Sequence, residues 1–184
     1  MAAMTKHVVI IGGGAIGSAV ARYLTRPEMQ AAHPCRVTVL ERDPTYARAS
    51  SALSASSIRQ QFSTAINLAI AQHRDAAREL AVPGEPPPDL GLHEGGYLYL
   101  ATPAGEGVLR DNHARQRASG ADVALLSPAE LQARFPWLAT EGIALGSLGL
   151  SGEGWFDGYS LLQAFRAQAR AQGARYVPAE AVGF

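Results

Sequence analysis

The sequence predicts an α/β fold that opens with a parallel β-α-β unit. A β-branched apolar run at residues 8–11 is typical of a strand buried on both faces of a parallel sheet. A glycine-rich turn and an amphipathic segment follow it directly, and a second apolar run ends at Leu40. Strand, helix and strand in this order form the crossover unit of a parallel sheet.

The first helix is expected to start after the glycines at residues 12–14. Its apolar face is formed by residues at helical spacing: Ile16, Ala19, Val20, Tyr23 and Leu24. Pro27 is expected to end this helix, and residues 27–34 are predicted to be a polar loop. The second strand is then expected at residues 37–40.

Residues 45–63 are rich in Ser and Ala and are expected to form an ordered loop. Ser63 can cap the helix that follows. The inner face of that helix is predicted from helical spacing: Ile66, Ile70, His73, Ala77 and Leu80. The Pro- and Gly-rich stretch at residues 83–88 ends the helix and is the strongest candidate boundary in the chain.

Beyond this boundary the predicted elements are shorter. Alternating aromatic and aliphatic residues at 97–100 predict a strand, and Asp157 or Ser160 can cap the last helix, which ends at Gly173. The other expected elements are helices at 106–118 and 128–135 and strands at 123–126, 143–148 and 175–177. Two large aromatic residues are expected in the core: Trp137 and Trp155.

Charge and cysteine content exclude several classes of function. The chain has 16 basic and 16 acidic residues, so no overall positive field favours nucleic acid or anionic lipid. Cys35 is the only cysteine, which excludes an internal disulfide and a cysteine-rich zinc site, and no metal is expected. The sequence shows neither a membrane span nor a signal peptide, so a cytoplasmic location is expected.

The glycines of the first turn have the spacing of a dinucleotide-binding motif. Gly12, Gly14 and Gly17 lie between the predicted strand and helix, and Glu41 closes the next strand. Gly12 permits the tight turn, Gly14 lets a pyrophosphate approach the backbone, and Gly17 lets the helix pack on the strand. The sequence therefore predicts a Rossmann-like FAD/NAD(P)-binding fold, with Glu41 accepting hydrogen bonds from a ribose diol.

The motif by itself does not distinguish FAD from NAD. The anionic Glu41 would repel a 2′-phosphate, which argues against NADP. Arg42 could instead assist NADP or stack on an adenine ring.

Five stretches of the chain resemble the FAD-dependent D-amino-acid oxidase/sarcosine oxidase superfamily, and together they extend over nearly all of residues 6–184. They are residues 9–17, 41–42, 57–62, 95–98 and 153–157. The resemblance implies FAD as the cofactor and a small-molecule amine or amino acid as the partner. The implied reaction is oxidation of that substrate, of the D-amino-acid or N-methyl amino-acid type, by hydride transfer to the flavin.

The resemblance also implies roles for individual residues. The residues expected at the FAD pyrophosphate and the adjoining helix start are Gly12, Gly14, Ala15, Ile16 and Gly17. Those expected elsewhere along the cofactor are Glu41 at the ribose, Arg42 and Val182 at the adenine, and Ser50, Ser51 and Ser57 beneath the flavin. Arg59 is expected to face the substrate carboxylate, which its planar guanidinium can bind through both oxygens. No catalytic base is identified.

Members of this family are much longer than the present chain. The resemblance implies a first part of the FAD-binding domain at residues 1–83, a segment of an inserted mixed-sheet substrate domain at 84–150, and a return to the FAD-binding domain at 151–184. We therefore expect an incomplete protein that lacks a C-terminal half or needs a second chain. Two other interpretations stay open: an NAD-dependent Rossmann dehydrogenase, and a non-catalytic nucleotide-binding or assembly module.

Overall fold

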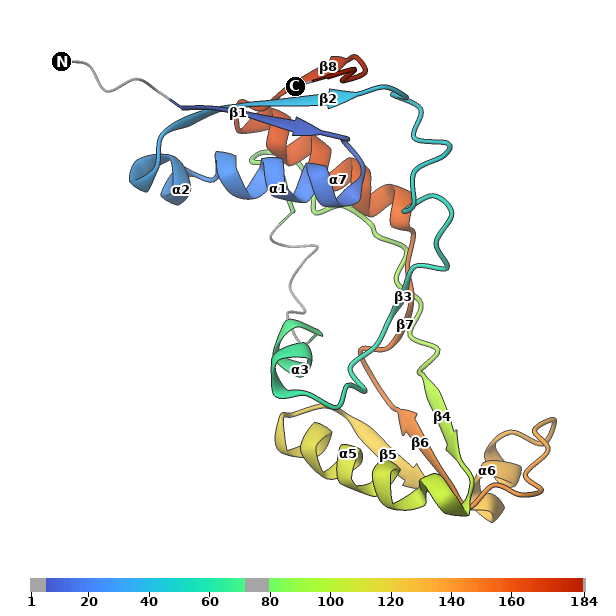
Figure 1. The fold of residues 1–184 in the computed structure, drawn as a ribbon. Helices are drawn as coiled ribbons and strands as arrows, with labels where there is room; N and C mark the ends of the chain where they lie inside the picture. Colours follow the sequence, from blue (N-terminus) through green and yellow to red (C-terminus); the bar gives the residue numbers. More distant parts are fainter. Residues whose placement is uncertain (1–5, 72–79, 184) are drawn as a thin grey trace. The chain divides into compact units, whose positions relative to one another are not determined.

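A computed structural model describes residues 6–71 and 80–183 of the chain (Figure 1). The chain divides into two compact units. The first unit comprises Met1–Ser56, Asp75–Gly91 and Asp157–Phe184, and the second comprises Ser57–Arg74 and Leu92–Phe156. The domain bounds expected near residues 83 and 150 stay a prediction, because they refer to the architecture of a longer protein.

The first unit is built on a three-stranded sheet of β1 (Lys6–Ile11), β2 (Cys35–Glu41) and β8 (Arg175–Pro178). Both strand pairs are parallel, in the order β1-β2-β8, so the three strands end at the same edge of the sheet. Two helices, α1 (Ala15–Thr25) and α7 (Gly158–Ala171), lie on one face of this sheet (Figure 1). The α/β fold and its parallel β-α-β start are confirmed.

Small side chains let the helices approach the sheet of the first unit closely. The buried hydrophobic cluster is formed by Ala21, Val37, Val39, Ala169 and Ala174. Ala21 and Ala169 come from the helices α1 and α7, Ala174 from the turn before β8, and the β-branched valines from the central strand β2, as strand propensity favours. This packing fixes where α1 begins relative to the end of β1.

The interval between α1 and β2 differs from the predicted loop, because it contains the short helix α2 (Pro27–Ala32). Pro27 occupies the first turn of this helix, where its fixed φ and missing N–H are favourable rather than disruptive. Arg26 has extended backbone angles and separates α2 from α1. The side chain of Gln30 donates to the carbonyl of Leu24 at 2.7 Å and ties α2 to the end of α1.

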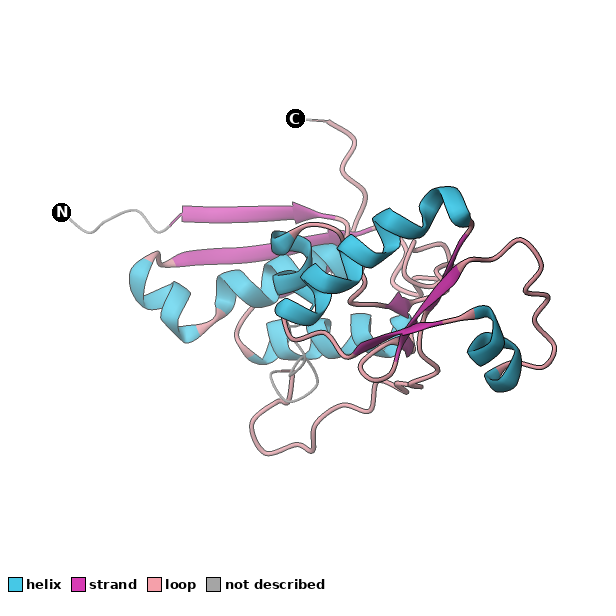
Figure 2. Ribbon diagram, turned by 90° about the horizontal axis from the view of Figure 1, so that it is seen from below, coloured by secondary structure: helices cyan, strands magenta, loops and turns pink. Residues whose placement is uncertain are grey.

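The second unit contains the antiparallel sheet β4-β6-β5, in which β6 is the central strand. Its strands are β4 (Leu98–Ala101), β6 (Leu145–Gly149) and β5 (Val123–Leu126). The unit also holds a two-stranded pair, β3 (Ser57–Ile58) with β7 (Gly154–Trp155). Figure 2 shows these strands in magenta. The described strand pairs of this unit are all antiparallel, whereas the resemblance implies a segment of a larger mixed sheet.

The helices of the second unit are α3 (Ala65–Ala71), α5 (Glu106–Ala118) and α6 (Pro128–Arg134), with a 3-10 turn η1 (Pro103–Gly105) before α5. The predicted inner face of α3 is only partly correct. Ile66 is 67% exposed, whereas Leu68 is 1% exposed. The side chain of Ile70 and the residues His73 and Ala77 lie outside the described part of the chain.

Both tryptophans expected in the core are exposed: Trp137 by 78% and Trp155 by 52%. Trp137 follows Pro136 in the loop after α6 and contacts the ring of Phe135 edge-on. Trp155 lies on the short strand β7 and stacks on His93 at a centroid distance of 5.3 Å. Among the described residues, each of these rings contacts one aromatic neighbour.

None of the described helices has the length and apolar character that crossing a membrane would require. Likewise, the described residues contain no group of three or more His, Cys, Asp or Glu side chains that could hold a metal ion.

Candidate functional site

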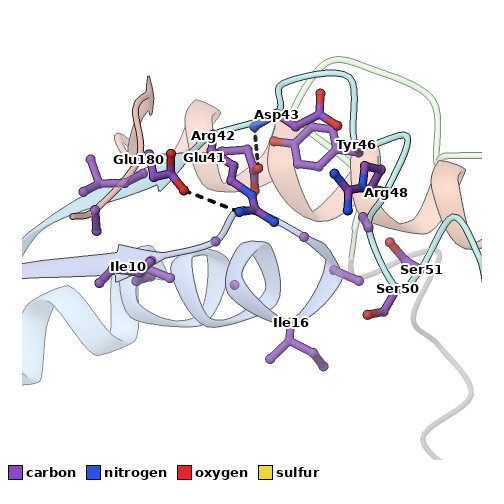
Figure 3. A pocket seen from close by; sticks show the side chains of 18 of the residues that line it. Ile10, Ile16, Glu41, Arg42, Asp43, Tyr46, Arg48, Ser50, Ser51 and Glu180 are labelled. Carbon is purple, nitrogen blue, oxygen red and sulfur yellow. Dashed lines mark hydrogen bonds and ion pairs between the residues drawn. The ribbon is translucent and has the colours of Figure 1, made fainter. Parts of the chain in front are cut away.

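A pocket of about 730 Å³ lies in the first unit where β1 and β2 end and α1 begins (Figure 3). Nine of the residues predicted to bind cofactor line it: Gly12, Gly14, Ala15, Ile16, Gly17, Glu41, Arg42, Ser50 and Ser51. They come from three separate stretches of sequence. The parallel sheet brings these stretches together because the carboxyl ends of its strands share one edge.

The three motif glycines have different structural roles. Gly12 has a φ of +93°, a conformation that side chains disfavour, and its N–H donates to the carbonyl of Leu40 at 2.8 Å. A Cβ at Gly17 would overlap the carbonyl oxygen of Gly12. A Cβ at Gly14 would have no neighbour within 4 Å. The turn therefore needs Gly12 and Gly17 for its own folding, whereas Gly14 leaves open space that a ligand can use.

The start of α1 is not capped by a side chain, since its N-cap residue is Gly14. The first N–H groups of a helix have no partner within the helix, and the helix dipole adds partial positive charge there. Ala15, Ile16 and Gly17, which carry these N–H groups, line the pocket. The arrangement suits an anion such as a phosphate.

Glu41 connects the end of β2 to the glycine turn. Its Oε2 accepts a hydrogen bond from the N–H of Gly13 at 2.7 Å, and its Oε1 accepts from the N–H of Asp43 at 2.8 Å. A carboxylate has about four acceptor sites, so lone pairs remain for a hydroxyl ligand. Glu41 is thus held in one orientation at the pocket while keeping acceptor capacity.

Two hydroxyl groups of the first unit form hydrogen bonds that stabilise the glycine turn. Ser18 is 0% exposed, and its Oγ donates to the carbonyl of Gly13 at 2.7 Å. The hydroxyl of Tyr176 in turn donates to Ser18 Oγ at 3.1 Å. Burial raises the pKa of Tyr176, so this phenol keeps its proton and remains a donor at neutral pH.

Arg166 of α7 lies between two tyrosine rings of the first unit. Its guanidinium carbon is 5.7 Å from the ring centroid of Tyr46 and 5.6 Å from that of Tyr176. Tyr46 is 2% exposed, has a φ of 58°, and lines the pocket. Burial raises the pKa of its hydroxyl as well. These contacts fix the loop after β2 against α7.

Several lining residues were not predicted from the sequence. Arg48 and Asp43 belong to the loop after β2, and Glu180 follows β8. The position of Glu180 could have been inferred, because a third parallel strand ends at the same edge as the first two. Glu180 forms an ion pair with Arg42 at 3.4 Å, in which both side chains are more than 60% exposed. Such a surface pair contributes little and leaves Arg42 accessible.

Three predicted residues are not in the lining of this pocket. Val182 is 95% exposed, whereas its neighbours Ala179, Glu180 and Ala181 line the pocket. Ser57 belongs to β3 and pairs with Trp155 in the second unit. Arg59 follows β3 in the same unit. Their expected roles stay predictions.

Arg59 is exposed and lies over two aromatic rings of the second unit. Its guanidinium carbon is 5.1 Å from the ring centroid of Phe62 and 5.8 Å from that of Tyr97. Cation–π contacts of this kind hold a guanidinium at a ring face and leave its N–H edge open. That edge can bind a carboxylate through two parallel hydrogen bonds.

A family model described as FAD dependent oxidoreductase matches residues 7–184. Among curated proteins, FAD-dependent oxidoreductase domain-containing protein 1 of Bos taurus is 45% identical over 184 residues, which are 97% of this chain and 38% of that protein. Its homolog in Drosophila melanogaster is 38% identical, over 96% of this chain and 34% of that protein. The chain thus spans well under half the length of the curated relatives it matches.

Solved structures of other proteins share this fold. The glycine oxidase from Geobacillus kaustophilus is 28% identical with a TM-score of 0.63, and the match covers 94% of this chain and 47% of that one. The L-proline dehydrogenase from P. horikoshii is 23% identical with a TM-score of 0.72, over 94% of this chain and 44% of that one.

Proposed function

This chain belongs to the FAD dependent oxidoreductase family, and from that membership we propose that the pocket of its first unit binds the adenosine diphosphate part of FAD. One observation supports this proposal most strongly. A Cβ at Gly14 would meet free space, and the helix that starts there has no side-chain cap. A pyrophosphate at this place can accept hydrogen bonds from the backbone N–H groups of the helix start. Glu41, held by Gly13 and Asp43, is placed to accept hydrogen bonds from the ribose.

The pocket fits the cofactor in size, and its lining offers both charged and hydroxyl groups. A volume of about 730 Å³ lies within the range of small-molecule and cofactor sites. Arg42 and Arg48 supply positive charge beside the carboxylates of Glu41, Asp43 and Glu180, and Ser50 and Ser51 supply hydroxyl groups. When bound, FAD supplies the acceptor of two electrons from the substrate, and the protein supplies binding, orientation and electrostatics.

For the complete protein we propose oxidation of a small amine or amino acid. The name of the 28%-identical glycine oxidase supports an amino-acid substrate. Arg59 supports a substrate with a carboxylate, since its guanidinium is exposed above Phe62 and Tyr97. Because the curated relatives are much longer, we assign this reaction to a protein in which a further segment or a second chain completes the site. A cytoplasmic location is part of the same proposal.

A pair of glycine variants tests the pocket assignment. Gly14→Val adds a branched side chain where a Cβ meets nothing, so we expect the fold to persist and FAD binding to be lost. Gly107→Val is the matched control, because Gly107 also lies near a helix start with no neighbour for a Cβ, but outside the pocket. Binding is measured by quenching of flavin fluorescence during titration of the purified chain.

A calorimetric titration with NAD addresses the second cofactor, because NAD has no flavin fluorescence to follow. We expect the wild type and Gly107→Val to bind FAD equally and Gly14→Val to bind it at least tenfold more weakly, about 1.4 kcal/mol. Equal FAD binding by all three proteins would refute the role of the turn. Binding of NAD without FAD would instead favour the dehydrogenase interpretation.

A further inference from the structure

A buried carboxylate in the second unit has no part in the function proposed above. Glu153 lies between β6 and β7 and is 1% exposed. Its Oε1 accepts hydrogen bonds from the N–H groups of Gln60 at 2.5 Å and Gln61 at 3.1 Å. Its Oε2 accepts from Nε2 of Gln61 at 2.8 Å. Charge-assisted hydrogen bonds like these compensate a buried anion for the water it has lost.

These donors form the turn that carries Arg59. The N–H of Phe62 donates to the carbonyl of Gln60 at 2.9 Å, so residues 60–62 turn tightly around the carboxylate. Arg59 precedes this turn and Phe62 ends it. The turn therefore brings the guanidinium of Arg59 to 5.1 Å from the ring centroid of Phe62.

The same hydrogen bonds reach the second ring that contacts Arg59. Nε2 of Gln61 also donates to the carbonyl of Tyr97 at 2.8 Å, and Ser147 Oγ donates to Gln61 Oε1 at 2.7 Å. Gln61 is 9% exposed and Ser147 is 1% exposed. Glu153 thus holds Gln61, and Gln61 holds the backbone from which the Tyr97 ring projects.

We propose that Glu153 is a positioning residue that orients the guanidinium of Arg59 toward a carboxylate group of the substrate. The proposal rests on the function assigned to Arg59 above. An exposed arginine loses much rotamer freedom when it is fixed, and this loss weakens the binding of any ligand that must fix it. Because Glu153 fixes both aromatic neighbours of Arg59, part of that freedom is lost before the ligand arrives.

The contacts around position 153 require a group that only accepts hydrogen bonds. In Glu153→Gln, the new amide N–H₂ would face either Nε2 of Gln61 or the two backbone N–H groups. Rotating the amide of Gln61 would place its oxygen opposite the new N–H₂ group, but its other acceptor contact would then be lost. The same oxygen would face the carbonyl oxygen of Tyr97, so two acceptors would lie together in place of two donors. The carboxylate also needs a glycine at position 149, because a Cβ there would overlap it.

NMR spectroscopy of the 184-residue chain tests the proposal. Ring currents of Phe62 and Tyr97 are expected to shift the Hδ and Hε resonances of Arg59 upfield in the wild type. Glu153→Gln is expected to lose this shift. Glu94→Gln is the matched control, because Glu94 is exposed and accepts one backbone N–H, that of Gly152, which a glutamine oxygen also accepts.

A second variant and a wild-type signal cover the case in which Glu153→Gln fails to fold. Gly149→Ala keeps the charge but displaces the carboxylate, so it is also expected to lose the Arg59 shift. Folded spectra of both variants with unchanged Arg59 resonances overturn the proposal. So does a wild-type amide proton of Gln60 that is neither far downfield nor protected from exchange, since its 2.5 Å bond to the carboxylate predicts both.

Addition of acetate separates this proposal from the function on which it rests. A shift of the Arg59 Nε–H resonance by acetate in the wild type, and its loss in Glu153→Gln, supports both. If the Arg59 resonances depend on Glu153 but acetate moves them in neither protein, Glu153 still positions Arg59, and the assignment of Arg59 to a carboxylate fails.

Discussion

The backbone N–H of Gly13 donates to Oε2 of Glu41 at 2.7 Å, so the glycine turn and the end of β2 are held in one arrangement. The two residues are 28 positions apart in the sequence and adjacent at the sheet edge. Glu41 thereby orders the turn beside the proposed phosphate site, and it also lines the pocket. The carboxylate that shapes the turn is therefore the same group that we propose binds the ribose.

Replacement of Glu41 tests this double role. We expect Glu41→Ala to weaken FAD binding about 10- to 100-fold, because a hydrogen bond to a charged group contributes about 1.5–3 kcal/mol. Fluorescence titration measures the loss, with Glu28→Gln on α2 as the control. Unchanged affinity in Glu41→Ala would show that its carboxylate binds only Gly13 and Asp43 and contributes nothing to the ribose.

The N-cap of α7 predicts a dependence of stability on pH. The hydroxyl of Ser160, which donates to Asp157 at 2.5 Å, lowers the pKa of Asp157 below its ordinary value of 3.8, and the N–H of Tyr159 adds a further hydrogen bond. A lowered pKa in the folded state means that the stabilisation is present above the ordinary value and is lost as pH falls through the folded value. Asp157→Asn keeps a good N-cap but cannot titrate.

We therefore expect the Tm advantage of the wild type over Asp157→Asn to be constant near neutral pH and to shrink below about pH 4. Thermal unfolding followed by circular dichroism from about pH 7 to about pH 3 measures it. Asp111→Asn, which removes an exposed carboxylate from α5, is the control. A difference between wild type and Asp157→Asn that stays constant across this range would contradict the prediction.

The capping box of α6 makes a prediction for the second unit. Ser127 Oγ accepts from the N–H of Glu130 at 3.3 Å, and Glu130 Oε2 accepts from the N–H of Ser127 at 2.7 Å. Ser127→Ala removes one of these reciprocal bonds and is expected to cost about 0.5–2 kcal/mol of stability. Denaturant unfolding measures this cost, and Ser119→Ala, just after α5, is expected to change little. Equal stability of the two variants would mean that α6 does not depend on its cap.

Local signals explain which elements the sequence could predict. Ser127 and Glu130 identify the start of α6 because a capping box needs only neighbouring residues. The turn at Gly12 and the end of β2 at Glu41 were predicted for the same reason. The loop predicted at Pro27 was wrong, because a proline can end one helix and can also favour the first turn of the next. The hydrogen bond from Gln30 to the carbonyl of Leu24, which ties α2 to α1, is not evident from the proline alone.

Features that depend on distant residues could not be predicted in this way. The buried environment of Tyr46, between the glycine turn and Arg166, requires α7 to pack beside α1. Trp137 is exposed in the loop after α6, whereas hydrophobicity alone suggests that it is buried. Likewise, the N–H donors around Glu153 come from residues more than 90 positions away.

The last two glycines of the motif, Gly14 and Gly17, give the sharpest contrast between folding and binding. A Cβ at Gly17 would overlap the backbone oxygen of Gly12, whereas a Cβ at Gly14 would have no neighbour within 4 Å. Backbone cannot yield as a flexible side chain can, so Gly17→Ala is expected to lose about 1–3 kcal/mol of stability and to weaken FAD binding through the displaced turn. Gly14→Ala is expected to unfold like the wild type, within about 0.5 kcal/mol.

Denaturant unfolding and FAD titration on the same two variants separate these effects. Gly17→Ala should be altered in both measurements, and Gly14→Ala should be altered in binding alone, because a single methyl group enters only the space proposed for the pyrophosphate. Equal stabilities would show that the turn can shift without cost at Gly17. Normal FAD affinity in Gly14→Ala, together with loss of affinity in Gly14→Val, would show that the pyrophosphate lies further from the backbone than a methyl group extends.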